Sequence, residues 1–338
     1  METWKRTVYI SLVCVFCTAF GVSQLAPILP LYFHDLGVQT PEAMSLWSGL
    51  ATGATYIIVC LAAPFWGRVA DKKGRKITLI RSSFGMALCN ILIAFQTTPE
   101  GVVLIRLVQG LVSGFYSASI TLIASESPIE RTGWALGLLA SANLAGSLIG
   151  PLLGGYIADT VGIRNDFIIV GTLMGLAGVL ATIFIHENYV PQPNPEKLSI
   201  RKLKEQIPEF NSIVALCVAS FIYAICIMSL QPVISVYIKG IVPSDTENLA
   251  FIAGAVFSAM GIAQLMSSSP LGKLVDKIGP RKVLVISLIY VGILNIPQAY
   301  VSDVYQLAII RFLQGFGLGG MLPALNTYLS SKTPREFT

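Results

Sequence analysis

The sequence predicts an all-α polytopic membrane protein built from two related halves. Of its 338 residues, 54% are hydrophobic and only 12% are charged, whereas about 25% of an ordinary soluble domain is charged. Charge-free apolar runs recur along the whole chain, and one charged segment returns 205 residues later. Composition, run length and repeat together exclude a soluble protein and favour a duplicated bundle of membrane-spanning helices.

Ten apolar runs are long enough to cross a membrane, because a helix needs about 20 mostly apolar residues to span the hydrocarbon core. They are too long and too uniformly apolar for the alternating strands of a membrane β-barrel. The first run is longer than a signal-peptide core and no cleavage pattern follows it, so we treat it as a retained span. The runs are Val8–Phe33, Leu46–Trp66, Ile77–Phe95, Val102–Ala124, Gly133–Ile157, Phe167–Ile185, Ile213–Ile238, Ala250–Leu271, Val283–Val301 and Tyr305–Leu329.

The positive charge of the chain predicts its orientation. Short loops rich in Lys and Arg stay on the cytoplasmic side. With the N-terminus inside, most of the 23 Lys and Arg residues fall in cytoplasmic segments, and only Arg164 and Lys239 fall outside. We therefore expect a multi-pass protein of the plasma membrane with a cytoplasmic N-terminus, in contact with membrane lipids, and no nucleic-acid partner.

An internal repeat divides the chain. The segment GRVADKKGRK at 67–76 returns as GKLVDKIGPRK at 272–282, and RLVQGLVSG at 106–114 returns as RFLQGFGLG at 311–319 with the same offset. We expect an N-terminal bundle of six helices in residues 1–187, a cytoplasmic linker rich in proline and basic residues at 188–210, and a C-terminal bundle of four helices in 211–338. The repeat predicts two further helices after these ten, so we interpret the chain as a truncated product or fragment rather than as a ten-span variant.

These segments resemble the signatures of the major facilitator superfamily of secondary transporters, whose two six-helix halves are related by an axis along the membrane normal. GRVADKKGRK is similar to the loop signature after the second helix, and Arg106, Gln109, Gly110 and Gly114 are similar to the signature of the fourth helix. The fifth span carries GxxxGPxxGG, similar to the pattern of the drug/proton antiporter branch, and other segments resemble bacterial multidrug efflux pumps. The resemblance covers essentially the whole chain and implies the major-facilitator fold.

In both charged loops, glycines permit a tight reversal between two helices, and the cations can serve topology alone. The resemblance implies that the aspartate of the first loop docks on the start of the eleventh helix in the outward-open state. By the repeat, Asp276 docks near the start of the fifth span, at Thr132 and Gly133. The residues of this conformational latch are Gly67, Asp71, Gly74, Arg75, Gly272, Asp276 and Gly279.

The fifth span places glycines at intervals of four, which gives a smooth face that another helix can approach closely. Generic packing is one interpretation. The other is a sealing contact between the halves, against Ala250, Gly254 and Ser258 of the eighth span. The residues of this antiporter motif are Gly146, Gly150, Pro151, Gly154 and Gly155.

Arg106 lies inside the fourth span, where a central cation costs about 2.5–3.5 kcal/mol on insertion scales. It can snorkel to the membrane surface, or it can belong to a polar face that lines a cavity. The resemblance implies that Arg106 takes part in proton coupling with Gln109. We expect the cavity walls to include Gln24, Tyr32, Ser113, Ser117, Thr121, Met228, Gln231, Ser235, Arg311 and Gln314.

The sequence shows no acidic residue in the middle of a span that could carry the exchanged proton. Proton-driven exchange needs an ionisable group within the membrane, and all 18 acidic residues map to loops or span ends. The nearest candidates are Asp35, beside His34, and Glu126.

We interpret the chain as a secondary active transporter that exports hydrophobic or cationic drugs in exchange for protons by alternating access. Alternatives are uptake or facilitated diffusion of an endogenous small solute, a non-transporting truncated product, and a receptor or scaffold. No enzyme motif is present, and we expect a monomer without cofactor or metal, driven by the proton gradient.

Overall fold

The computed structural model describes residues 3–187, 210–243 and 246–332, and the description of the structure below is confined to them. In this part of the chain, ten helical segments are long and apolar enough to cross a membrane. The predicted class, an all-α polytopic membrane protein, is therefore confirmed. The expected linker at 188–210 lies outside the described residues except for Phe210.

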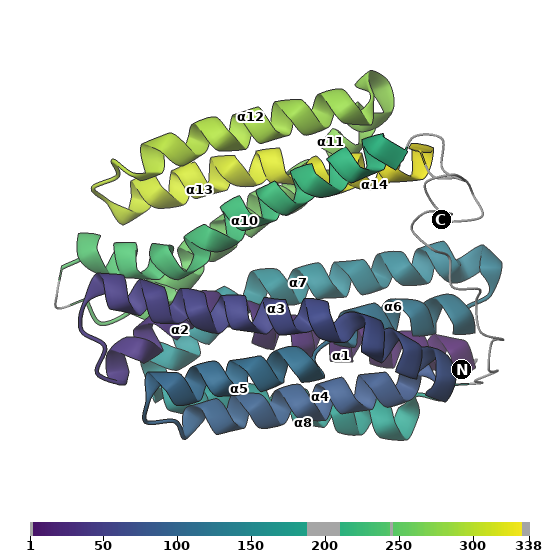
Figure 1. Cartoon of the computed structure of the whole chain (residues 1–338), viewed down its shortest axis with the longest axis horizontal. Coiled ribbons are helices and arrows are strands. Elements are labelled where there is room, and N and C mark those ends of the chain that lie inside the picture. Colours follow the sequence, from purple (N-terminus) through teal and green to yellow (C-terminus); the bar gives the residue numbers. More distant parts are fainter. Residues whose placement is uncertain (1–2, 188–209, 244–245, 333–338) are drawn as a thin grey trace. The chain divides into compact units, whose positions relative to one another are not determined.

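Eight helices form the N-terminal six spans, in which the first and fourth spans are each made of two helices (Figure 1). Spans two and five are 33 residues long, about 50 Å at 1.5 Å per residue, so both extend well beyond the hydrocarbon core. The helices are α1 (Thr3–Ser23), α2 (Leu25–Asp35), α3 (Pro41–Lys73), α4 (Arg75–Ala94), α5 (Pro99–Val112), α6 (Phe115–Glu126), α7 (Ile129–Val161) and α8 (Ile163–Phe184).

The remaining five helices form four spans, and the last span is again divided. They are α10 (Phe210–Ile241), α11 (Leu249–Ile278), α12 (Pro280–Gln298), α13 (Val304–Gly319) and α14 (Met321–Lys332). The divisions in spans four and ten fall at matching places of the repeat, at Ser113–Gly114 and at Gly320.

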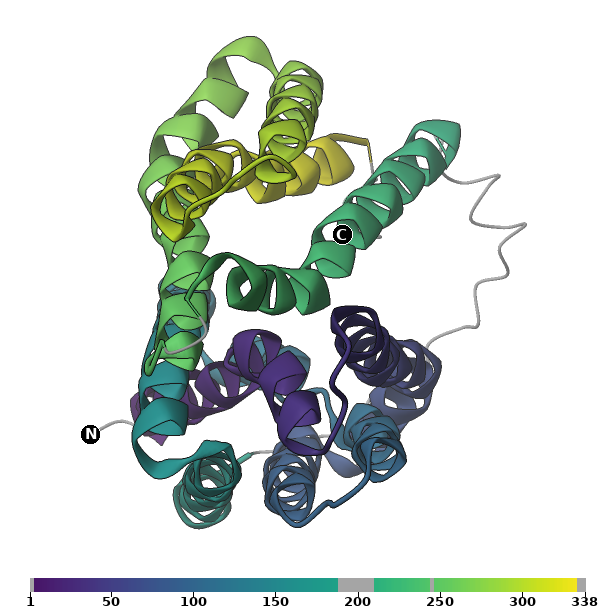
Figure 2. The ribbon, with the colours of Figure 1, turned by 90° about the vertical axis from the view of Figure 1, so that its left-hand side faces the viewer.

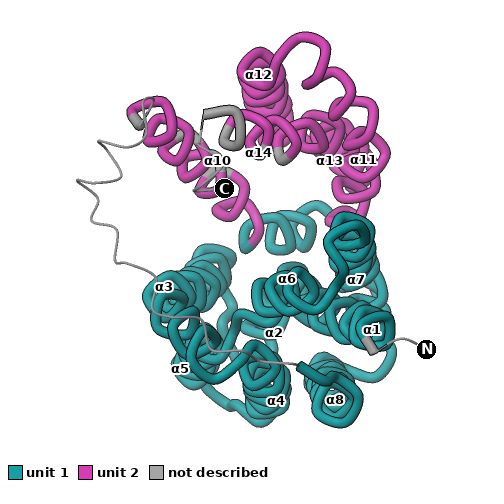
Figure 3. Tube along the Cα trace, turned by 90° about the vertical axis from the view of Figure 1, so that its right-hand side faces the viewer, with its two compact units in different colours: residues 1–193, 232–254 teal, residues 194–231, 255–338 magenta. Residues whose placement is uncertain are grey.

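The chain divides into two compact units, which Figure 3 colours separately. The first contains residues 1–193 and 232–254, and the second contains residues 194–231 and 255–338. The end of α10, the start of α11 and the loop between them thus belong to the first unit, although the sequence repeat assigns them to the second half.

In the first unit α1 packs on α7, α3 on α5 and α4 on α8, and their axes run side by side (Figures 1 and 2). Glycines sit where backbones come closest. A Cβ added at Gly146 would overlap the carbonyl oxygen of Phe16 on α1, and one added at Gly171 would press on α4. Such small-residue contacts replace the hydrophobic driving force that is absent between helices in lipid.

The first unit has two ends, which we name by their loops. The basic end carries the α3–α4 turn at Gly74 and lies on the right in Figure 1. The opposite end carries the α2–α3, α4–α5, α7–α8 and α10–α11 connections. Threonines start two helices there: Thr40 and Thr98 each accept a hydrogen bond from the N–H three residues on, at 3.3 Å, ahead of a proline in the first turn, as N-caps do.

Candidate functional site

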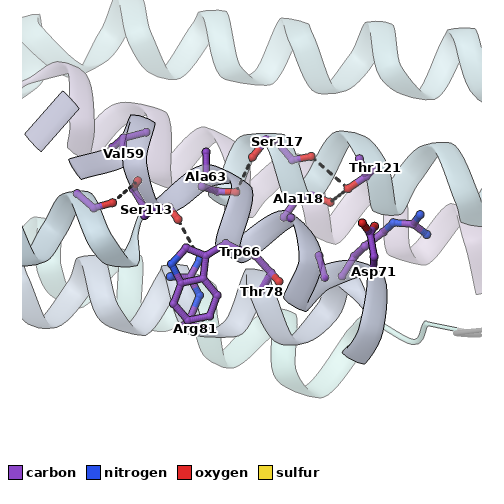
Figure 4. A pocket seen from close by; sticks show the side chains of 16 residues that line it. Val59, Ala63, Trp66, Asp71, Thr78, Arg81, Ser113, Ser117, Ala118 and Thr121 are labelled. Atoms are coloured by element: carbon purple, nitrogen blue, oxygen red, sulfur yellow. Dashed lines mark hydrogen bonds between the residues drawn. The ribbon is translucent and has the colours of Figure 1, made fainter. Parts of the chain in front are cut away.

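A cavity of about 350 Å³ opens in the first unit among helices α3 to α6, near the basic end (Figure 4). It combines apolar walls with a few polar groups, the usual make-up of a small-molecule site. Its walls are Val59, Ala62, Ala63, Trp66, Gly67, Ala70, Asp71, Arg75, Thr78, Arg81, Gly110, Ser113, Gly114, Ser117, Ala118 and Thr121.

One wall is held by a stacked pair. The Arg81 guanidinium carbon lies 3.5 Å from the centre of the Trp66 ring, and the two groups face each other in Figure 4. Arg81 donates to the carbonyl oxygens of Leu111 (3.2 Å) and Ser113 (3.0 Å), and the indole N–H of Trp66 donates to Leu111 at 2.8 Å. These carbonyls are available because the fourth span breaks at Gly114, which has φ of +111°. The planar fork of an arginine suits this pair of acceptors.

The fourth span presents its small polar residues to the cavity. Ser113, Ser117 and Thr121 line it, with their hydroxyls donating to carbonyls one turn earlier in their own span at 2.9 to 3.2 Å. Because these hydroxyls donate to the backbone of their own span, they form a weakly polar wall whose oxygens can still accept a hydrogen bond.

Arg106 does not line this cavity. Its side chain is 6% exposed and donates to Oε1 of Gln109 at 2.6 Å. The hydroxyl of Thr55 on α3 donates to the backbone carbonyl of Arg106 at 3.0 Å. The structure thus places the two residues of the fourth-span signature together, inside the bundle rather than at a membrane surface.

The second unit repeats this arrangement. Arg311 is 1% exposed and donates to Gln314 at 3.4 Å, and Gln314 donates to Oδ1 of Asn295 at 2.9 Å. A Cβ at Gly315 would overlap a carbonyl of α11, as one at Gly110 would overlap the Thr55 carbonyl of α3. The sequence offset of 205 residues therefore corresponds to equivalent contacts in the two units.

The other expected residues have varied surroundings. The Tyr32 hydroxyl donates to the carbonyl of Ile93 at 2.7 Å, and Tyr32 is fully buried. Asp35 is exposed beside His34, at 3.8 Å, and Glu126 is half-buried. Met228 packs in a core cluster of the second unit, Gln231 is half-buried there, and Ser235 is buried in the first.

The turn at the basic end has a partner that sequence reasoning missed. Both carboxylate oxygens of Glu187, just after α8, accept the first backbone N–H groups of α4, from Arg75 at 2.7 Å and Lys76 at 2.8 Å. A carboxylate there is favoured by the partial positive charge of a helix start. Asp71 faces the cavity. Its docking on an eleventh helix stays a prediction, as does that of Asp276, which lies in the other unit from Thr132.

A third copy of the loop signature, also missed, lies at the opposite end. GYIADTVGIR at 155–164 shares Gly, Ala-Asp and Gly with GRVADKKGRK at 67–76. The turn glycines have the same backbone, with φ and ψ of 90° and 160° at Gly74, 91° and 148° at Gly162, and 90° and 148° at Gly279. Residues with a Cβ disfavour this conformation. The signal was the spacing G-x-x-A-D-x-x-G, but without its lysines the copy is inconspicuous.

In this third copy Asp159 holds the start of another helix. Its Oδ1 accepts the N–H of Ala250 at 3.1 Å and its Oδ2 accepts the N–H of Phe251 at 2.7 Å. Beside it, Gly155 lies against the Ala250 carbonyl and Gly254 lies against the Pro151 carbonyl, so closely that neither tolerates a Cβ. We call these contacts the α7–α11 seal. They join α7 of the first sequence repeat to α11 of the second.

Comparisons with known proteins agree with this geometry. The family model of the Major Facilitator Superfamily matches residues 11–241 and 216–337. A "Multi-drug resistance efflux pump PmrA homolog" of Lactococcus lactis is 40% identical over 98% of this chain and 82% of its own length. A "Multidrug resistance protein MdtG" of Salmonella dublin is 38% identical over 96% of this chain and 80% of its own length.

Solved structures show the same fold at low identity. A mutant of the nucleoside transporter NupG has a TM-score of 0.75 and 13% identity, covering 99% of this chain and 84% of its own. The human organic anion transporter MFSD10 has a TM-score of 0.69 and 15% identity, covering 98% of this chain and 87% of its own. Sequence signatures, ten spans, repeated contacts and these relatives together show that the chain is a multi-pass membrane protein belonging to the Major Facilitator Superfamily.

Proposed function

We propose that this protein exports hydrophobic or cationic drugs across the plasma membrane in exchange for protons, by alternating access. It works as a monomer with a cytoplasmic N-terminus, in contact with lipid and without a cofactor, and the proton gradient drives it. Drug export is supported by the relatives named for multidrug resistance, which match nearly the whole chain.

The α7–α11 seal is the observation that carries the mechanism. Alternating access needs contacts at one end of the protein that can open as a unit while the two halves stay folded. Two hydrogen bonds to a single carboxylate, two glycine contacts and one edge-to-face ring contact, between Tyr156 and Phe251, meet this need, because they join two otherwise complete helices through a small contact area. The seal lies at the opposite end of the first unit, and Asp71 lies near its basic end; we propose that the loops of Asp71 and Asp276 act as a conformational latch.

The buried signature residues support coupling. A buried guanidinium whose side-chain hydrogen bond goes to a neutral amide, as in Arg106 and Gln109, is costly, and an ionisable residue kept inside a membrane bundle at such a cost is a candidate for function. Arg106 and Gln109 are therefore proposed to sense proton binding. Asp35 and Glu126 are the proton carriers that the sequence predicts. The side chains of the fourth span that line the cavity are proposed to contact the drug.

A ligand panel in proteoliposomes tests this function. We add lipophilic cations, neutral dyes or small polar solutes outside vesicles whose lumen is more acidic than the outer buffer. We expect cationic dyes to accumulate in the acidic lumen and to leave when an ionophore collapses the gradient. Accumulation of polar solutes alone, or transport that ignores the gradient, would contradict drug antiport and favour the uptake or facilitated-diffusion alternative.

A further inference from the structure

A carboxylate in the first turn of α8 is buried more deeply than its place in the sequence suggests. Asp166 is 0% exposed, and so is Gln24, the residue between α1 and α2. The Gln24 amide Nε2 donates to Oδ2 of Asp166 at 3.1 Å. A carboxylate so near a helix start usually accepts backbone N–H groups there, but in the described structure Asp166 accepts none.

Both side chains keep an oxygen without a donor. Oδ1 of Asp166 and Oε1 of Gln24 are buried and accept no hydrogen bond from any described residue. Each of these buried oxygens without a donor destabilises the fold, because its lost contact with water is not replaced. A single proton on Oδ1 of Asp166 would remove both deficits, because a neutral carboxyl donates one O–H while its other oxygen still accepts. The acid and the amide then form a ring of two hydrogen bonds.

Among the residues that the structure describes, no cation forms an ion pair or a hydrogen bond with this carboxylate. From α2 the Tyr32 ring packs on Phe167, but its hydroxyl donates to the carbonyls of Ile93 and Gln96. On α8 itself, Arg164 also donates to the Gln96 carbonyl, at 3.3 Å.

Two further neighbouring helices, α7 and α4, present neutral groups near this pair. From α7, Gly154 presses on the Gln24 amide, and from α4 the Asn90 amide is bound to Met86 and Met174. An ionised carboxylate in such a site, with one neutral donor, costs several kcal/mol. The neutral acid is the form that this site favours.

We propose that Asp166 is the group that binds the exchanged proton, and that the conformation described here holds it as the neutral acid paired with Gln24. The step forms the Oδ1–H bond with a proton from the acidic side, and release breaks this bond when water reaches the carboxyl. The inference rests on the proposed antiport, and it replaces Asp35 and Glu126 as carriers.

The helix α7 connects this proton site to the α7–α11 seal. Gly150 and Gly154 lie against Ser23 and Gln24, and Asp159 follows five residues later on the same helix, about 7.5 Å along its axis. Both sites lie at the end of the unit that carries the α7–α8 connection, so release of α11 from α7 would open the end at which the Gln24–Asp166 pair lies. Opening of the seal and access to the proton site would then be a single event.

Asp166→Asn tests the assignment, because its amide mimics the neutral acid and cannot release a proton. We expect the variant to exchange drug for drug across the vesicle membrane, while accumulation driven by the pH gradient falls to that of empty vesicles. The matched control is Glu42→Gln, which neutralises an exposed carboxylate in the first turn of α3 and should accumulate drug as the parent does. Gradient-driven accumulation by Asp166→Asn at the parent's level would overturn the proposal.

Infrared titration decides the protonation without any transport. A neutral carboxyl absorbs in a C=O band that an ionised one lacks. We expect the parent protein to show such a band at neutral pH, displaced in Asp166→Glu and absent in Asp166→Asn. An identical band in the parent and both variants would overturn the proposal, and this holds even if the parent fails the ligand panel. Should Asp166→Asn not fold, Asp166→Glu alone still gives the displacement.

Discussion

Single carboxylates define the two ends of the first unit. Glu187 holds the start of α4 and Asp159 holds the start of α11, each with both oxygens on two successive backbone N–H groups. Each lies at or just after the end of a spanning helix, where a charge is solvated during insertion. Each contact sets a negative charge against the partial positive charge at a helix start and so fixes the orientation of that helix relative to its neighbour.

Asp159→Asn should weaken the α7–α11 seal, because an amide oxygen is neutral and the amide NH₂ repels the second N–H. We expect a loss of about 0.5–2 kcal/mol, as for other helix caps. Spin labels at Thr160 and Asn248, both exposed, should then report a population with a longer separation.

The control for this variant is Asp303→Asn. Asp303 also precedes a helix, α13, but its side chain makes no capping hydrogen bond. The label separation should stay that of the parent. An unchanged separation in Asp159→Asn as well would show that the glycine contacts alone maintain the seal.

The sequence predicts where each acidic residue lies relative to the spans but not whether its side chain is buried. Asp166 maps to the edge of an apolar run, where an aspartate is ordinarily solvated. It is buried because it lies on the face of α8 that packs against Gln24, whereas Arg164 and Asn165 in the same turn are exposed. Burial of this kind depends on the tilt and contact of neighbouring helices, which one apolar run does not encode.

At the scale of helices, the apolar runs predicted the number of spans and missed their interruptions. Gln24 and Gly114 divide two spans inside apolar stretches. The break at Gly114 has no charge or proline to mark it, whereas Pro27 and Pro30 follow the break at Gln24 and are a signal that the apolar runs did not use. The freed carbonyls of Leu111 and Ser113 are satisfied by Arg81, a residue that the sequence presents only as one more cation of a basic loop.

Gly254→Ala tests the close approach of α11 to α7. A Cβ there would overlap the backbone carbonyl of Pro151, which cannot rotate away, so the helices must separate at a cost of about 1–3 kcal/mol. We expect a lower midpoint of thermal unfolding in detergent.

Gly137→Ala provides the comparison for this change. It makes the same substitution inside α7 at a position with open space around the added carbon, and should leave the midpoint unchanged or raise it, since alanine favours a helix. Equal midpoints for both variants would contradict the packing of these two helices described above.

At the scale of the molecule, the repeat was the most informative part of the sequence. An offset of 205 residues predicted that Arg311 and Gln314 correspond to Arg106 and Gln109, and the units give both pairs the same hydrogen bond. The boundary between the two units could not be predicted from the repeat. Residues 232–254 group with the first unit through contacts made by α7, which join distant parts of the chain.

Orientation remains a prediction from charge, and labelling can test it. In a cysteine-free background, Gln39→Cys lies at the opposite end and Arg131→Cys at the basic end, both exposed. We expect a membrane-impermeant maleimide added to intact cells to label position 39 and to reach position 131 only after lysis. The reverse labelling pattern would contradict the cytoplasmic N-terminus and would reverse the proposed direction of transport.

The hydrogen bonds that Asp159 accepts have a practical consequence. The amide hydrogens of Ala250 and Phe251 are covered only while α7 and α11 touch, so their exchange with heavy water measures how often the seal opens. The ratio of their exchange rate to that of a free amide converts directly into an opening free energy. The exchange of two backbone hydrogens thus measures how often α7 and α11 separate, and repeating the measurement with each drug and at each pH tests whether that separation responds to substrate and to protons.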